Sequence, residues 1–168
     1  IRLKGKTIKA LMGPQAPYYG DHVELSDGGT DFASSIGIGA VVGTKFTWPI
    51  GAKEGSRHDL TPEREETWKK WLGIYSELEL PYGTYRGDLY DIGFDRPEGH
   101  AIQKADRMYY AFYADNWKGA LSLRGLEEQD YRLRDYETDR DLGTVTGPDA
   151  TLSAEFVDHL LIEATPVE

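Results

Sequence analysis

The apolar residues of this chain follow two different periods, one in each half of the sequence. A helical period runs from Pro62 to about Leu78. Thr61 is a favourable N-cap, proline suits the first helical position, and three glutamates follow at the positive end of the helix dipole. We interpret the apolar stripe as core and expect it to pack on a large surface such as a sheet. Its members are Trp68, Trp71, Leu72, Tyr75 and Leu78.

From Tyr85 onward the period changes to two, which is typical of β-strands. Turn-forming residues separate the apolar runs at spacings of roughly 8–12 residues, as in an antiparallel sandwich or a small barrel. The first of these runs is apolar on both faces and should be the central strand. The expected strands are Met108–Tyr113, Gly119–Leu123, Tyr131–Asp135, Thr144–Val145, Thr151–Phe156 and His159–Ala164.

The first half offers too few strands for a closed core. Lys6–Leu11 is expected to form a short strand, and a loop rich in Pro, Gly, Tyr and Asp follows it over residues 15–30. Ile36–Val42 is expected to be a glycine-rich strand that another backbone or a ligand approaches closely, or else a tightly packed turn in a core. A sheet this small leaves both edges and one face unsatisfied. We therefore expect residues 8–80 to need a neighbour, and the chain to be the C-terminal piece of a larger enzyme.

The composition restricts the classes of function. A net charge of -10 disfavours binding to nucleic acid or to an anionic membrane surface. No apolar stretch approaches the ~18 residues of a membrane span. The absence of cysteine excludes disulfides, thiolate metal sites and cysteine nucleophiles. The four histidines are scattered, and we expect neither a metal nor another cofactor. No signal peptide is visible, and a cytoplasmic and a secreted location both stay open.

The order of several short motifs points to a family. The motifs are Leu11-Met12-Gly13, Gly20-Asp21-His22-Val23, Leu60-Thr61-Pro62-Glu63 and Leu121-Ser122-Leu123-Arg124-Gly125-Leu126. Together with the glycine-rich segment between the second and the third, this order resembles the C-terminal third of melibiase-type retaining α-galactosidases, glycoside hydrolase family 36 and its relatives. The chain departs from the family pattern in having Asp21 before His22, and this departure leaves the subfamily and the sugar open.

The resemblance implies a fold and a reaction. Residues 1–82 would be the last elements of a (β/α)8 catalytic barrel, and residues 83–168 an antiparallel β-sandwich domain, so that the fold class is α/β plus all-β. The parent enzyme would hydrolyse terminal α-galactosides with retention, using two carboxyl groups roughly 5–5.5 Å apart. In the family both aspartates come from earlier barrel strands, so this chain has no catalytic residue assigned and should be inactive alone. Its partner would be the remainder of the barrel, as a companion chain or an N-terminal fragment.

The same resemblance suggests substrate-binding residues. The loop before the glycine-rich segment would lie on the face where barrel enzymes build their sites. Asp21 and His22 would bond the hydroxyls of an α-galactoside, and Tyr18 or Tyr19 would stack on its pyranose ring. Alternatively, Asp21 and His22 hold the loop through hydrogen bonds to its backbone. Asp31 would either face the pocket or cap the segment behind it.

A second hypothesis is a carbohydrate-binding or interaction β-module without catalytic activity. Its binding platform would consist of exposed aromatic side chains on the strands, namely Tyr109, Tyr113, Trp117 and Tyr131. Such a module would have no need of the amphipathic helix or of the glycine-rich segment, because both require something to pack on. The pattern of the first half therefore favours the enzyme.

Overall fold

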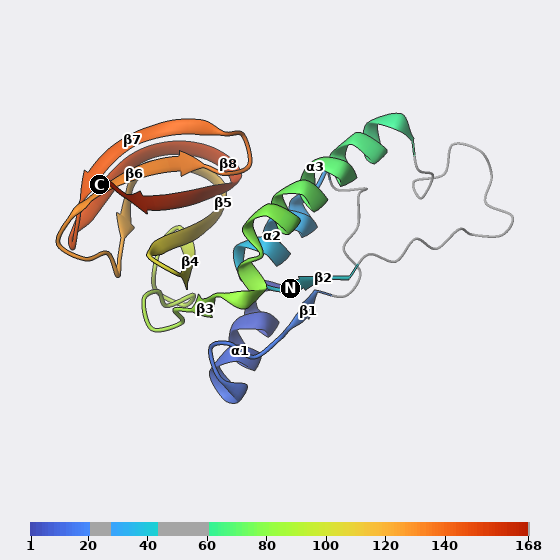
Figure 1. The fold of residues 1–168 in the computed structure, drawn as a ribbon, viewed down its shortest axis with the longest axis horizontal. Helices are drawn as coiled ribbons and strands as arrows, with labels where there is room; N and C mark the ends of the chain where they lie inside the picture. Colours follow the sequence, from blue (N-terminus) through green and yellow to red (C-terminus); the bar gives the residue numbers. More distant parts are fainter. Residues whose placement is uncertain (21–27, 44–60, 168) are drawn as a thin grey trace, which may run out of the picture.

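The computed structural model of the chain describes residues 1–20, 28–43 and 61–167. The helices are α1 (Arg2–Met12), α2 (Thr30–Gly37), α3 (Pro62–Leu78) and the short 3-10 helix η1 (Leu80–Tyr82) (Figure 1). The strands of the first half are β1 (Tyr19–Gly20) and β2 (Val41–Val42). Those of the second half are β3 (Thr84–Tyr85), β4 (Glu98–Lys104), β5 (Arg107–Leu123), β6 (Asp130–Asp135), β7 (Arg140–Thr146) and β8 (Ala150–Pro166).

The second half is a six-stranded antiparallel sheet with the strand order β3-β4-β5-β8-β6-β7. The run Met108–Tyr113 is buried and lies on the inner strand β5, as predicted. Strands β5 and β8 have 17 residues each. The segments Met108–Tyr113 and Gly119–Leu123, which the sequence suggested as separate strands, are the two ends of β5. Asp115-Asn116 separates these two segments, and its residue types predict a turn there. The structure has a bulge instead, because Ala114 pairs with Asp158 and Asn116 with Val157, which leaves one extra residue on β5.

Each face of this sheet carries an apolar core. On one face Tyr110 and Phe112 of β5 cluster with Leu121 and Leu123 from the far end of the same strand. These four residues share one cluster because β5 and β8 curl, and the sheet encloses this core from several sides (Figure 1). The predicted antiparallel character of the second half is thus confirmed.

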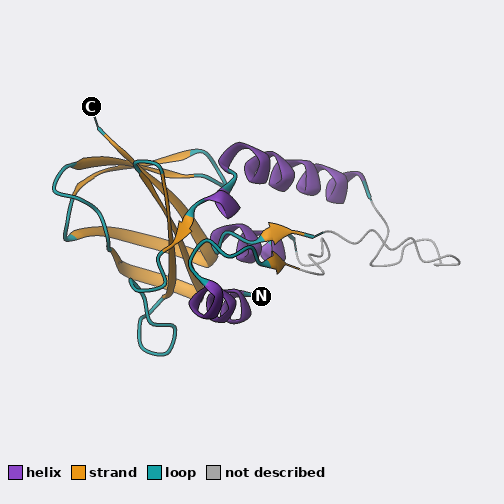
Figure 2. Cartoon of the chain, turned by 60° about the horizontal axis from the view of Figure 1, so that its bottom comes forward, coloured by secondary structure: helices purple, strands orange, loops and turns teal. Residues whose placement is uncertain are grey.

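The helices cover the other face of the sheet, and Figure 2 shows them gathered on one side of the strands. Phe32 of α2 stacks on Trp71 of α3, with ring centres 6.2 Å apart. The hydroxyl of Tyr113 on β5 donates a hydrogen bond of 2.9 Å to the carbonyl oxygen of Ala33. One cluster of buried residues therefore joins the first half of the chain to the second.

Helix α3 has the predicted bounds, Pro62–Leu78. The hydroxyl of Thr61 accepts a hydrogen bond from the backbone N–H of Arg64, as expected of an N-cap. Trp71 and Leu78 of the predicted stripe are buried, and its other members are half-buried. The expectation that this stripe packs on the outside of a sheet is met in part, because Trp71 also contacts α2.

Glycine at position 37 lets α2 approach the sheet closely. A Cβ atom there would lie 2.1 Å from the Tyr113 hydroxyl and 2.6 Å from the Ala111 Cβ. We expect Gly37→Ala to lower the free energy of unfolding by about 1–3 kcal/mol, because the added methyl group overpacks this contact. Gly73→Ala in α3 is the matched control: its methyl group would enter open space, and alanine should stabilise the helix by up to about 1 kcal/mol. Urea unfolding measures both changes, and equal effects would contradict the close approach.

Strands β1 and β2 form a two-stranded parallel sheet, with α2 between them in the sequence. Tyr19 pairs with Val41 and Gly20 with Val42. A parallel pair joined by a helix is the βαβ unit, from which α/β sheets and barrels are built. This arrangement lies within the first half of the chain, where the sequence predicted α/β elements.

Several strand predictions for the first half are wrong. Lys6–Leu11 belongs to α1, although its Thr and Ile residues favoured a strand. Close packing holds this helix in place, because Gly5 lies so near Tyr18 and Ile38 that an added Cβ atom would clash with them. Ile36 and Gly37 end α2, and only Val41–Val42 of the expected strand is extended. The alternative, a tightly packed turn in a core, is confirmed at Ile38 and Gly39, which form a buried turn. Strand β4 was missed, because its buried positions include Gly99 and His100 and so lack an apolar alternation.

Candidate functional site

The parallel strands β1 and β2 end on the same edge of their small sheet. The backbone N–H of Val41 bonds the carbonyl oxygen of Tyr18 at 2.7 Å, and that of Gly43 bonds the carbonyl oxygen of Gly20 at 3.0 Å. In α/β sheets and barrels, ligands bind at the carboxyl ends of parallel strands, where the loops into the following helices converge. This edge is therefore the candidate functional site.

Tyr19 is exposed at this edge. Gly20 lies against α2, since a Cβ atom built on it would be 2.7 Å from the Ser35 hydroxyl oxygen. Side chains alternate along a strand, so Tyr19 projects to the face away from α2. Its side chain is 67% exposed, whereas Tyr18 is buried at 6%. Of the two tyrosines suggested for stacking, only Tyr19 is available to a sugar.

Asp31 lies in the first turn of α2 and is half-buried. Gly29, with a φ of 103°, occupies the N-cap position, so Asp31 is not the cap residue itself. A carboxylate in the first turn is stabilised by the positive end of the helix dipole. Since α2 follows β1, its N-terminal end belongs to the same edge as Tyr19. Asp21 and His22 come directly after Gly20 in the sequence and lie outside the described residues.

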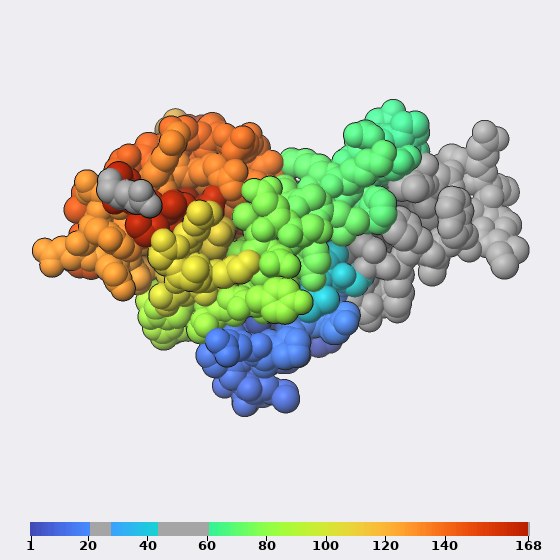
Figure 3. All heavy atoms as spheres, in the orientation of Figure 1, coloured from blue at the N-terminus to red at the C-terminus, as the bar shows by residue number. Residues whose placement is uncertain are grey.

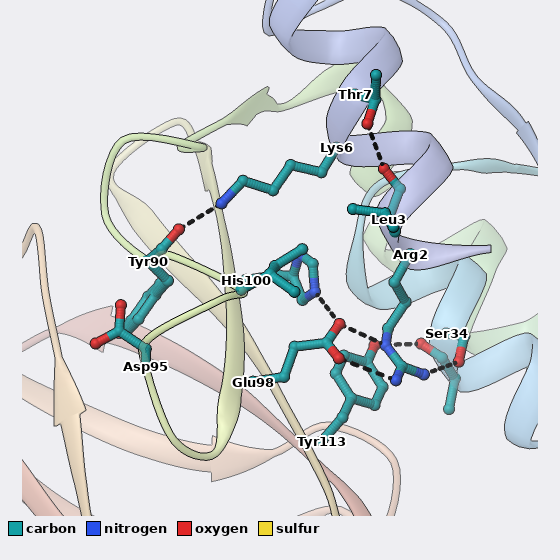
Figure 4. A network of polar contacts seen from close by, with 12 residues as sticks. Arg2, Leu3, Lys6, Thr7, Ser34, Tyr90, Asp95, Glu98, His100 and Tyr113 are labelled. Atoms are coloured by element: carbon teal, nitrogen blue, oxygen red, sulfur yellow. Dashed lines mark hydrogen bonds and ion pairs between the residues drawn. The ribbon is translucent and has the colours of Figure 1, made fainter.

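A polar network that the sequence analysis missed holds this unit against the sheet (Figure 4). The guanidinium of Arg2 on α1 binds both carboxylate oxygens of Glu98 on β4, at 2.7 and 3.2 Å. It also donates to the Ser34 hydroxyl on α2 at 2.9 Å and lies 4.1 Å from the ring centre of Tyr113. Arg2 therefore connects two helices and two strands of the large sheet. Its partner Glu98 is 96 residues away in the sequence, which explains why no local motif signalled the pair.

His100 extends the network into the core. Its Nε2 lies 2.8 Å from Oε1 of Glu98, and its Nδ1 lies 2.7 Å from the hydroxyl of Tyr85. Burial lowers the pKa of His100, although the neighbouring carboxylate opposes this change. The ring is therefore neutral, with Nε2 donating to Glu98 and Nδ1 accepting from Tyr85. This network positions α1 and α2, and it lies beneath the helices rather than at the candidate edge.

The Glu98 carboxylate should make the free energy of unfolding depend on pH. Burial alone would raise its pKa, but the hydrogen bonds from His100 and Arg2, together with the charge of Arg2, outweigh burial and lower the pKa to about 2. The carboxylate should therefore stabilise the fold fully above the unfolded value near 4.5, and this contribution should be lost as the pH falls through about 2. Glu98→Gln should be destabilising near neutral pH and nearly neutral near pH 2. Urea unfolding across this pH range measures the difference. Glu128→Gln, at an exposed position, is the control and should change the free energy of unfolding near neutral pH by less than about 0.5 kcal/mol.

The alternative aromatic platform is wrong for three of its four residues. Tyr109, Tyr113 and Tyr131 are at most 5% exposed. Their hydroxyls are occupied within the protein, by Glu163, by the Ala33 carbonyl and by the Glu127 backbone N–H respectively. Aromatic residues at strand positions here fill the two cores instead of forming a surface.

Among residues 1–20, 28–43 and 61–167, no group of three or more His, Asp or Glu side chains is arranged to hold a metal ion. None of the helices described in these ranges is long and apolar enough to cross a membrane.

Comparison with known proteins gives this geometry a context. No family model matches the chain. The chain is 34% identical, over 174 aligned residues, to the "A type blood alpha-D-galactosamine galactosaminidase" of Flavonifractor plautii. The chain is related to part of a glycosidase. The predicted resemblance to α-galactosidases and their close relatives is thereby confirmed. The match covers 99% of the chain but spans only 15% of the length of that relative.

Solved structures of glycosidases share the fold. The GH27 β-L-arabinopyranosidase of Geobacillus stearothermophilus superimposes with a TM-score of 0.56 at 15% identity, covering 86% of this chain and 31% of that enzyme. The α-amylase of Geobacillus thermoleovorans superimposes with a TM-score of 0.55 at 14% identity, covering 89% of this chain and 38% of that enzyme. Because these enzymes act on different sugars, the shared fold does not by itself select a substrate.

Proposed function

We propose that this chain is the C-terminal portion of a retaining glycoside hydrolase that acts on terminal α-galactosides or α-galactosaminides. Residues 1–82 would complete a (β/α)8 barrel with two strands and their helices, and residues 83–168 would cap that barrel as a β-sandwich domain. The observation that carries the proposal is the parallel β1–α2–β2 unit, with α1 before it and α3 after it, in a chain related to a galactosaminidase.

Exposed apolar side chains on the first half of the chain support the proposal that a neighbouring part of the barrel covers them. Parallel sheets are stable only when both faces are covered and more strands are present. The sheet of β1 and β2 has two strands, and the described chain leaves Tyr19 exposed on its face away from α2. Leu3, Leu11 and Met12 of α1 are 67–81% exposed, on the helix that protrudes from the surface in Figure 3. The rest of the barrel, as a companion chain or an N-terminal part, would cover these side chains.

In the assembled enzyme this chain would bind substrate and leave the bond-breaking steps to other residues. A carboxylate nucleophile attacks the anomeric carbon, and a carboxylic acid protonates the leaving oxygen. Both groups would come from earlier barrel strands. Tyr19 would stack on the pyranose ring, while Asp21, His22 and Asp31 would bond its polar groups at the carboxyl edge of β1. Exposed aromatic faces bind sugar rings by burying their apolar C–H surface.

Substitution of Tyr19 tests this proposal in the complete parent polypeptide. We expect Tyr19→Ala to lower kcat/KM for a 4-nitrophenyl α-galactoside or α-galactosaminide by about tenfold or more, because a stacking contact is lost. Tyr82→Ala removes another tyrosine, which is 80% exposed on η1, and should leave the rate unchanged.

Two results would overturn the proposal. One is hydrolysis of these substrates by residues 1–168 alone, because the catalytic carboxylates would then lie within this chain. The other is an intact parent polypeptide that cleaves neither substrate. If Tyr19→Ala and Tyr82→Ala lowered kcat/KM equally, the assignment as a glycosidase would stand. The placement of Tyr19 in its substrate pocket would be wrong.

A further inference from the structure

A cavity of about 440 Å³ lies between α1 and the start of the large sheet. One wall is the C-terminal half of α1 with the Gly13-Pro14 turn, and the other is the segment Thr84–Asp88. The two walls are joined by a backbone hydrogen bond of 3.1 Å from Tyr85 to the Pro14 carbonyl. The cavity is therefore a built feature of the junction between α1 and the sheet.

Lys9 is a buried lysine in the wall of this cavity. The residue is 3% exposed, and its Nζ donates one hydrogen bond of 3.1 Å, to the Ala16 carbonyl oxygen. It also lies 6.0 Å from the ring centre of Tyr85. An ammonium group carries three donors, and burying a charge without partners costs free energy. Within the described part of the chain, two of its donors are left for another acceptor.

The lining is positive in a strongly acidic protein. Lys6, Lys9 and Arg86 line the cavity together with one carboxylate, Asp88. Asp88 accepts hydrogen bonds of 3.1 and 2.9 Å from Arg86 and so neutralises that guanidinium. Lys6 donates a hydrogen bond to the Tyr90 carbonyl oxygen (Figure 4). This acceptor is uncharged and does not neutralise the ammonium group. No carboxylate of the lining pairs with Lys6 or Lys9. Outside the lining Asp95, which is paired with Arg124, also lies within electrostatic range of Lys6.

We propose that this cavity binds an oxyanion, a phosphate or sulfate group that is either free or attached to a sugar. Charge-assisted hydrogen bonds from two ammonium groups would hold the oxyanion. Ala10 and Pro14 are exposed apolar residues of the lining, against which a sugar ring could lie. The volume exceeds the need of a free oxyanion and falls in the range of small-molecule sites.

Titration calorimetry of the full chain at low ionic strength tests the site. The probes are inorganic phosphate, inorganic sulfate, galactose 6-phosphate and uncharged galactose. We expect saturable binding of charged probes and none of galactose. Lys9→Met should weaken binding by about tenfold or more, because a charge-assisted bond is lost. Lys4→Met, on the exposed side of the same helix, should change it by less than about twofold. If the sugar phosphate binds more tightly than inorganic phosphate, the ligand is an oxyanion attached to a sugar. If inorganic phosphate binds more tightly, the ligand is a free oxyanion.

The proposal fails if no charged probe saturates below about 20 mM, a limit of very weak affinity. It also fails if Lys4→Met and Lys9→Met weaken binding equally, because binding would then reflect diffuse surface charge. Thermal melting of each variant checks that the fold is intact. Should Lys9→Met not fold, Lys6→Met gives a second measurement, with the same loss expected.

Discussion

Replacing Trp71 by alanine is expected to lower the free energy of unfolding by about 3–5 kcal/mol. The Trp71 side chain is 1% exposed, and its ring stacks on Phe32 and lies 6.1 Å from the ring of His159 on β8. It therefore joins α2, α3 and the sheet in one core. Truncation would remove its buried surface and leave a cavity that three rigid elements cannot close.

Trp68→Ala is the matched control for this prediction. Trp68 lies one turn earlier on α3 and is only half-buried, so the same truncation should cost about 1–2 kcal/mol. Chemical denaturation of the full chain, followed by far-ultraviolet circular dichroism, measures both variants. A cost below about 1 kcal/mol for Trp71→Ala would contradict the buried position of the stripe.

The second large effect is expected at Glu163, a buried carboxylate in β8. Its side chain is 4% exposed and binds Arg107 at 2.7 Å, Arg134 at 2.7 Å and the Tyr109 hydroxyl at 3.1 Å. Burial alone would raise its pKa, but the two arginines outweigh burial and lower it. Glu163→Gln should cost about 2–3 kcal/mol, because it removes the negative charge that compensates two guanidinium groups.

The same substitution at Glu155 provides the control, because this residue lies on the same strand. Glu155 pairs with Lys118 at 2.8 Å, and both side chains are at least 70% exposed. Exposed pairs contribute about 0–1 kcal/mol, so Glu155→Gln should be nearly neutral. Urea unfolding measures the loss in free energy of unfolding for both variants. Similar losses at the two positions would show that burial does not determine how much Glu163 stabilises the fold.

Part of the fold could be predicted from local sequence patterns. Helix α3 was predicted with its bounds because capping residues and a long apolar stripe agree over 17 residues. The antiparallel strands followed from period two. The turn signal at Asp115-Asn116 misled, since a bulge in a long strand and a hairpin turn use the same residues.

The candidate site was less predictable. The loop was identified through the family resemblance, and Tyr19 through its position in that loop. Strands of two residues, such as β1 and β2, are too short to show any period. Their parallel pairing and the exposure of Tyr19 against Tyr18 appear only in three dimensions.

The sequence alone determined the elements whose signals are local: the helix Pro62–Leu78, the alternating strands of the second half, and the kinship with α-galactosidases carried by short motifs in order. The tertiary structure decided that Lys6–Leu11 is helical, that β1 and β2 are parallel, and that Arg2 meets Glu98. These features depend on contacts between residues far apart in the chain. Local propensity is weak there, and burial and charge pairing set the conformation.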